Sequence, residues 1–174
     1  MAKNTRTTLY VMVGDVVIPA SYILLCVCSG SYYDNFTGLR TDSVFGIWFY
    51  ITAICTAAYL FYALHTLGRQ TIRKNELPIL LLIMTVSLFM PYRSAGDLVS
   101  NIHIILAYAA FLYMNILLAR IVDFNRRIIS IYVCLLIPCI LLIITAMSIT
   151  GLSETIYVCG VSIILTQLLV KNSQ

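Results

Sequence analysis

Six apolar stretches, separated by short polar segments, make up most of this 174-residue chain. Each stretch is about 15–23 residues long, and a helix needs about 20 residues to cross the hydrocarbon core of a bilayer. The pattern therefore predicts one all-α, polytopic transmembrane bundle over residues 1–174. Its six helices are expected at about 8–29, 45–67, 77–91, 99–119, 128–149 and 155–170.

The third predicted helix is the shortest, with Pro78 at its start and Pro91 at its end. At about 15 residues it covers about 22 Å, less than the roughly 30 Å of a bilayer core. We expect either an extra turn at each end, or a locally thin membrane around a helix that is surrounded by protein.

Composition supports the membrane assignment. Apolar residues make up 61% of the chain and charged residues only 10%, whereas a soluble domain is nearer half apolar and a quarter charged. These values exclude an ordinary water-soluble domain, and they exclude intrinsic disorder, which requires low hydrophobicity. Membrane lipids are therefore the expected surroundings.

The lysines and arginines are unevenly divided between the two sides of the predicted bundle. This asymmetry predicts that both termini are cytoplasmic, because cytoplasmic loops carry the excess of basic residues. Topology explains these residues without nucleic acid as a partner. The short loops and small size favour a bacterial inner membrane, that is, a plasma membrane. One side carries Lys3, Arg6, Arg69, Arg73, Lys74, Arg120, Arg126, Arg127 and Lys171, and the other carries Arg40 and Arg93.

No metal or cofactor is expected. All six cysteines fall inside predicted helices, which favours packing roles over disulfides. His65 and His103 belong to opposite membrane surfaces, so they cannot form the paired axial ligands of a transmembrane haem. The chain also contains no His-Glu-x-x-His motif.

The outer ends of the predicted helices hold the densest polar set, and we expect a ligand site there. Arg93 would neutralise an anionic headgroup or carboxylate, and His103 would give pH sensitivity near neutrality. The predicted function is to bind or move a small polar or amphipathic ligand, such as a lipid headgroup, an ion or a solute. The rim of the site would consist of Tyr92, Arg93, Asp97, Asn101 and His103.

Two other functions stay open at this point. One is an intramembrane hydrolase or transferase for lipid-linked substrates, with His103 as base and Asp42 or Asp97 as its partner. The six-residue spacing of Asp97 and His103 is poor on a helix, whereas Ser100 is better placed. The other is a non-catalytic subunit packed against other membrane chains. A homo-oligomer is also compatible with the sequence.

Asp15 lies about two turns inside the first predicted helix, where an unpaired carboxylate is costly. Acids in this position act as proton or ion sites or as partners of a base. Asp15 is therefore a second candidate, for a proton or an ion. A structural role is the alternative, since the side chain could reach water, Arg69, Arg120 or Arg127.

The segment from Ser87 to Phe111 contains the pattern Phe-x-Pro…His-x-x-x-Ala…Phe, beginning at Phe89-Met90-Pro91 and continuing at His103. It resembles the six-helix membrane family that includes the damage-regulated autophagy modulators and their bacterial relatives of unknown function. The resemblance implies a role in membrane lipid organisation, trafficking or solute handling. Pro91 and His103 would be its motif positions.

Overall fold

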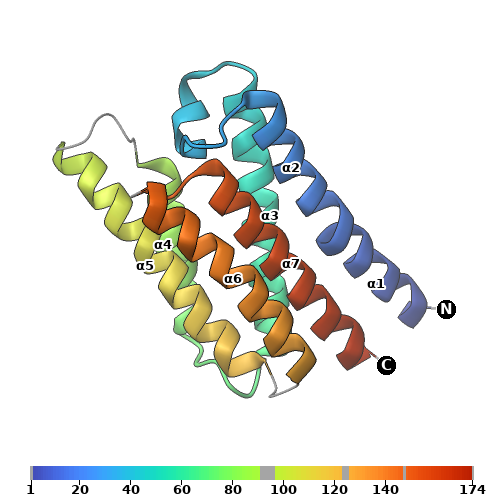
Figure 1. Ribbon diagram of the computed structural model, residues 1–174. Coiled ribbons are helices and arrows are strands. Elements are labelled where there is room, and N and C mark those ends of the chain that lie inside the picture. Colours follow the sequence, from blue (N-terminus) through green and yellow to red (C-terminus); the bar gives the residue numbers. More distant parts are fainter. Residues whose placement is uncertain (1, 91–96, 123–125, 147, 174) are drawn as a thin grey trace. The chain divides into compact units, whose positions relative to one another are not determined.

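The computed structural model describes residues 2–90, 97–122, 126–146 and 148–173, with backbone alone for residues 2–6, 41, 126 and 127. All elements in this part of the chain are helical, which confirms the all-α prediction. In chain order they are α1 (Ala2–Val11), η1 (Met12–Val17), α2 (Ile18–Ser29), η2 (Phe36–Thr41), α3 (Phe45–Leu67), α4 (Glu76–Phe89), α5 (Leu98–Ile121), α6 (Arg126–Ala146) and α7 (Gly151–Ser173) (Figure 1).

Five helical segments are long and apolar enough to cross a membrane, namely Thr7–Ser29, α3, α5, Ile128–Ala146 and α7. The sixth apolar helix, α4, has 14 residues and is shorter. The chain thus has the helices of a multi-pass membrane protein.

Local chemistry explains where several helices begin and end. α3 spans the predicted residues, and Asp42 Oδ1 caps its start by accepting hydrogen bonds of 2.8 Å from the N–H groups of Val44 and Phe45. α4 ends at Phe89, two residues before the predicted end. Met90 is already extended, as expected for a residue that precedes proline.

The last helix begins four residues earlier than predicted, at Gly151, because its first turn is capped from two sources. Thr150 and Ser153 exchange hydrogen bonds between side chain and backbone N–H in both directions. The loop after α2 supplies two carbonyl acceptors: Asp34 to the N–H of Gly151 at 2.7 Å, and Tyr32 to that of Leu152 at 3.3 Å.

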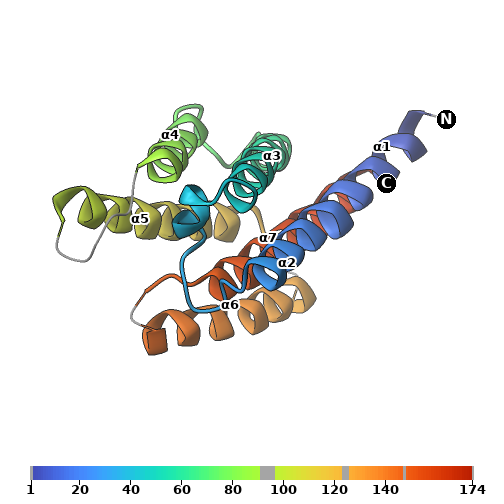
Figure 2. The same cartoon turned by 90° about the horizontal axis from the view of Figure 1, so that it is seen from above.

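The chain divides into two compact units, and each is described by itself. The first unit comprises residues 1–63 and 124–174. In it, α1, η1 and α2 form one continuous helical run beside α7, while α6 lies along another side of α7 (Figures 1 and 2).

Helix α7 is antiparallel to this first helical run. Cys159 on α7 contacts the carbonyl of Pro19, and Gln167, two turns later, contacts Asp15. The N- and C-terminal ends of the chain therefore lie at the same end of this unit (Figure 2).

A loop residue fills the other end of the first unit. The Phe36 side chain has no exposed surface, and its ring lies 5.9 Å from Tyr22 and 6.1 Å from Phe49, between centroids. This aromatic contact fixes the loop against α2 and α3.

The second unit comprises residues 64–123, in which α4 and α5 pack as an antiparallel pair. Arg120 near the end of α5 donates to Glu76 at the start of α4, over 2.7 Å. His103 near the start of α5 bonds the Ser87 carbonyl near the end of α4. α4 therefore lies along most of the length of α5.

Candidate functional site

Asp15 lies in a π-helical turn within the long first helical run. The Ile18 N–H donates to the Val13 carbonyl, five residues earlier, in place of the four of an α-helix. Pro19 explains the wider turn, because its ring would clash with the Asp15 carbonyl in a regular α-helix and it has no N–H to donate. Such π-helical turns are frequent at functional sites.

The turn makes an unusually close contact with α7 through Gly14. Ser162 Oγ donates a 2.6 Å hydrogen bond to the Gly14 carbonyl. A Cβ atom on Gly14 would overlap the hydroxyl oxygens of Thr166 and Tyr59, which lie 2.5 Å from each other. Glycine is therefore required for the first and last helices to approach this closely.

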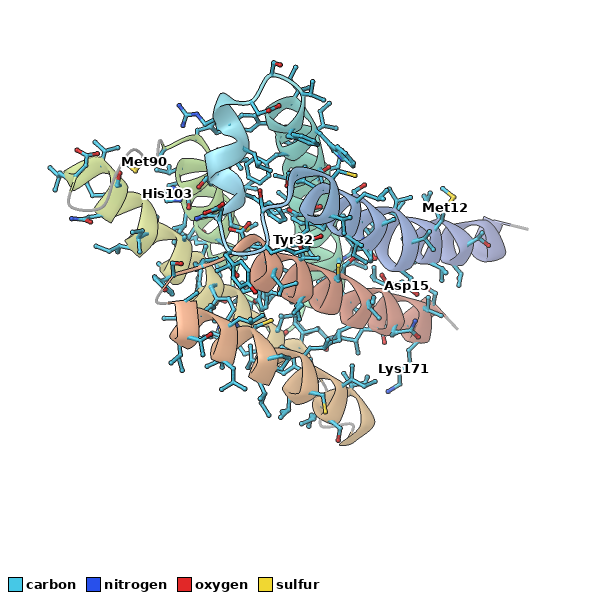
Figure 3. All side chains as sticks on the ribbon, turned by 45° about the horizontal axis from the view of Figure 1, so that its top comes forward. Met12, Asp15, Tyr32, Met90, His103 and Lys171 are labelled. Carbon is cyan, nitrogen blue, oxygen red and sulfur yellow. The ribbon has the colours of Figure 1, made fainter. Side chains whose placement is uncertain are left out.

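The two carboxylate oxygens of Asp15 have different surroundings. Oδ2 accepts a 3.1 Å hydrogen bond from Gln167 Nε2 on α7. Oδ1 is enclosed by protein and has no hydrogen-bond partner among the described residues. Figure 3 shows Asp15 between the first helical run and α7. An enclosed oxygen without a partner carries a desolvation cost of about 1–3 kcal/mol, and more when it is charged.

Neutral hydroxyl groups lie near this carboxyl group. Tyr59 and Thr166 lie beside Asp15, and the hydroxyls of Tyr10 and Tyr62 form a 2.8 Å hydrogen bond nearby. All of these groups are neutral at physiological pH. The surroundings therefore suit a carboxyl group that carries a proton, or a carboxylate that binds a small cation.

The structure gives Asp15 a partner that the sequence did not single out. Its observed partner is Gln167, and Arg120 instead forms an ion pair with Glu76. Hydrogen bonds from the Arg73 backbone N–H and from Arg120 lower the pKa of Glu76, which precedes the apolar stretch of α4. The side chain of Arg127 lies outside the described residues.

Three residues of the predicted outer rim lie in the described part of the chain, and their surroundings differ. Asp97 is the N-cap of α5 and accepts from the N–H and the hydroxyl of Ser100, both at 3.3 Å. Asn101 is exposed, whereas His103, two positions on, is only 1% exposed. Tyr92 and Arg93 lie outside the described residues, so the rim as a whole stays a prediction.

His103 connects α5 to α4. Its Nδ1 lies 2.9 Å from the Ser87 carbonyl, which can only accept, so this nitrogen carries the proton. Asp42 and Asp97 both cap helices. The hydrolase or transferase that the sequence leaves open stays a prediction.

Comparison with family models, with curated proteins and with solved structures finds no match to this chain. Its function is therefore inferred from the geometry around Asp15. Within the described part of the chain, no group of three or more His, Cys, Asp or Glu side chains could hold a metal ion.

Sequence reasoning identified Asp15 but missed its surroundings on α7. Two signals were present. Pro19 follows Asp15 by four residues, which predicts a disturbed helical turn. In the last helix, small polar residues recur at spacings of three and four, which places them on one face. They are Thr155, Cys159, Ser162 and Thr166.

Proposed function

We propose that this chain is an integral membrane protein with six crossings and two cytoplasmic termini, and that it binds a proton or a small cation at Asp15. The observation that carries the proposal is the enclosed Asp15 Oδ1, which lacks a hydrogen-bond partner among the described residues. An ionisable group within a membrane helix is energetically costly. Where one occurs, it normally has a function or a charged partner.

The antiparallel contact between the first helical run and α7 supports an even number of crossings, since it brings both chain ends to one side. Five long helices are an odd number, so α4 is required to cross as well. Its 14 residues cover about 21 Å. We propose that α5 shields α4 along most of its length where the bilayer is locally thin.

The distribution of positive charge supports the orientation. With six crossings, nine of the eleven lysines and arginines lie on the side of the two termini. The plasma membrane of a bacterium remains our proposal for the location, on the basis of the chain's small size and short loops.

The tight packing at Gly14 supports a ligand of minimal size. The contact with Tyr59 and Thr166 leaves no room for even one added carbon atom. We therefore take the ligand at Asp15 to be a proton or a small cation, separate from the polar or amphipathic ligand predicted at the outer rim. Lipid or solute handling, as the family resemblance implies, would then be coupled to this site.

Infrared difference spectroscopy of the purified protein at acid and alkaline pH tests the proposal. We expect a carbonyl band of a protonated carboxylic acid that Asp15→Asn removes. Asp34→Asn is the matched control, because Asp34 lies exposed on the loop after α2 and its variant should keep the band.

The same spectra recorded in sodium, potassium and choline salts show whether the ligand at Asp15 is a proton or a small cation. A band that disappears only on adding sodium or potassium ions indicates a cation site, whereas a band that depends on pH alone indicates a proton site. A folded Asp15→Asn variant whose spectra match those of the unmodified protein would contradict the proposal.

A further inference from the structure

Glu154 lies at the opposite end of α7 from the Asp15 site. It belongs to the first turn of the helix and is partly exposed. The Tyr22 hydroxyl and the Cys26 thiol of α2 lie within electrostatic range of its carboxyl group. At 1.5 Å per residue, Glu154 and Thr166 lie about 18 Å apart along α7.

Buried hydroxyl groups occupy the space between these two ends. On α3, Thr52, Thr56 and Tyr59 follow one another at spacings of four and three, so they share one helix face. On α7, Ser162 and Thr166 lie beyond Glu154. Each of these five side chains is less than a tenth exposed, as is Tyr22 of α2.

Thr56 is the most informative member of this set because it is 3% exposed and its Oγ1 has no hydrogen-bond partner among the described residues. The Tyr22 hydroxyl lies beside it, and Tyr59 follows one helical turn later. Buried hydroxyls are normally paired, so this one requires an explanation. A water molecule needs two to four polar partners, and Thr56 and Tyr22 would supply two of them.

We propose that these hydroxyl groups form a proton path from Glu154 at the outer end to Asp15 near the cytoplasmic end. The proposal rests on the proposed function of Asp15 and adds the route and a second carboxyl group. Glu154 takes up a proton from the outside. Each hydroxyl or water then passes one proton on as it receives another, and Asp15 releases one to the cytoplasm. One proton crosses for each one taken up, and no other reactant is required.

Proteoliposomes that contain a pH-sensitive dye and carry a potassium diffusion potential test the path. The purified full-length protein should admit protons faster than empty vesicles do. Glu154→Gln and Asp15→Asn should reduce the rate to that of empty vesicles, because each removes the titratable group at one end. Thr56→Val should slow entry, and Thr56→Ser, which keeps the hydroxyl, should restore it.

Two matched controls should conduct like the unmodified protein. Thr145→Val removes an exposed hydroxyl that bonds its own helix on α6, and Asp34→Asn removes an exposed carboxylate. A thermal melt of each variant in detergent identifies those that are folded.

The outcomes distinguish this path from the proposed function itself. If Asp15 shows its infrared band but the unmodified protein admits no protons, the path is wrong and the site remains. Unchanged proton entry in folded Glu154→Gln and Thr56→Val variants would also overturn the path. The absence of the Asp15 band would instead refute the proposed function.

Discussion

Helices α6 and α7 lie side by side in one unit, yet they distribute polar and apolar residues in opposite ways. α6 is the most apolar of the five long helices, yet only 6% of the residues in its apolar 18-residue stretch are buried. α7 is the least apolar of the five, and 56% of the residues in its corresponding stretch are buried. The exposed side chains of α6 include Ile137, Leu141 and Ile144, whereas α7 buries Ser162 and Thr166 completely.

In a water-soluble protein the most apolar helix would be the most buried, because burial of apolar surface stabilises the folded state. The reverse order indicates that hydrocarbon surrounds this unit. Lipid tails are as apolar as a protein core, so burying apolar side chains does not drive helices together. Helix association therefore depends on close packing and interhelical hydrogen bonds. The contact of η1 with α7 has both features, and the Asp15 carboxyl group lies within it.

The largest expected effect comes from filling the close contact on one side of α7. Gly14→Ala should lower the free energy of unfolding by about 2–3 kcal/mol, because its methyl group would overlap Thr166 and Tyr59. Gly160→Ala, on the side of α7 that faces α6, should change it by less than about 1 kcal/mol. There the nearest atom is the flexible end of Leu135, and alanine is the better helix former.

Unfolding in mixed micelles, followed by circular dichroism, measures both changes. Equal costs at the two glycines would show that the two sides of α7 are packed alike, which would contradict the comparison.

Removal of single hydroxyls should have a smaller effect and should again separate the two helices. Thr166→Val should cost about 1 kcal/mol, because it removes the partner of Tyr59 and the bond to the Ser162 carbonyl. Thr145→Val on α6 should cost close to nothing, since that exposed hydroxyl bonds only carbonyls of its own helix. The same unfolding assay measures both, and a larger loss for Thr145→Val would reverse the comparison.

The smallest effect is expected at the ion pair between Arg120 and Glu76 in the second unit, because ion pairs near the surface contribute little to stability. Hydrogen bonds from Arg73 and Arg120 lower the pKa of Glu76, so this pair stabilises the folded state above the ordinary glutamate pKa of about 4.3. That stabilisation is lost as the pH falls through the lowered pKa. The melting temperatures of the unmodified protein and Glu76→Gln should differ slightly at pH 7 and converge in acid. A difference that widens in acid would contradict this sign.

Patterns of neighbouring residues predicted much of the fold. The limits of α3 follow from its apolar run and from Asp42, which lies three residues before Phe45 and caps it. The start of α7 was harder to predict. Its first N–H groups bond the carbonyls of Tyr32 and Asp34, and such a contact between distant segments leaves no periodic trace in the sequence.

The candidate sites were likewise predictable only where they depend on residues close together in the sequence. The cost of a carboxylate in hydrocarbon was sufficient to single out Asp15, but its partner Gln167 lies 152 residues away. The outer rim was predicted from polar residues that are close in sequence. Asn101 and His103 nevertheless differ in burial because they point in different directions on α5.

Spin-label accessibility in lipid bilayers tests most directly whether hydrocarbon surrounds α6. Single labels are placed at Ile137 and Ile144 on α6, and at Asp34 as a reference on the exposed loop, in a background without native cysteines. We predict that dissolved oxygen relaxes the α6 labels strongly and a water-soluble nickel chelate hardly at all, with the opposite preference at Asp34. Labels on α6 that respond to the nickel chelate as strongly as Asp34 would contradict the account.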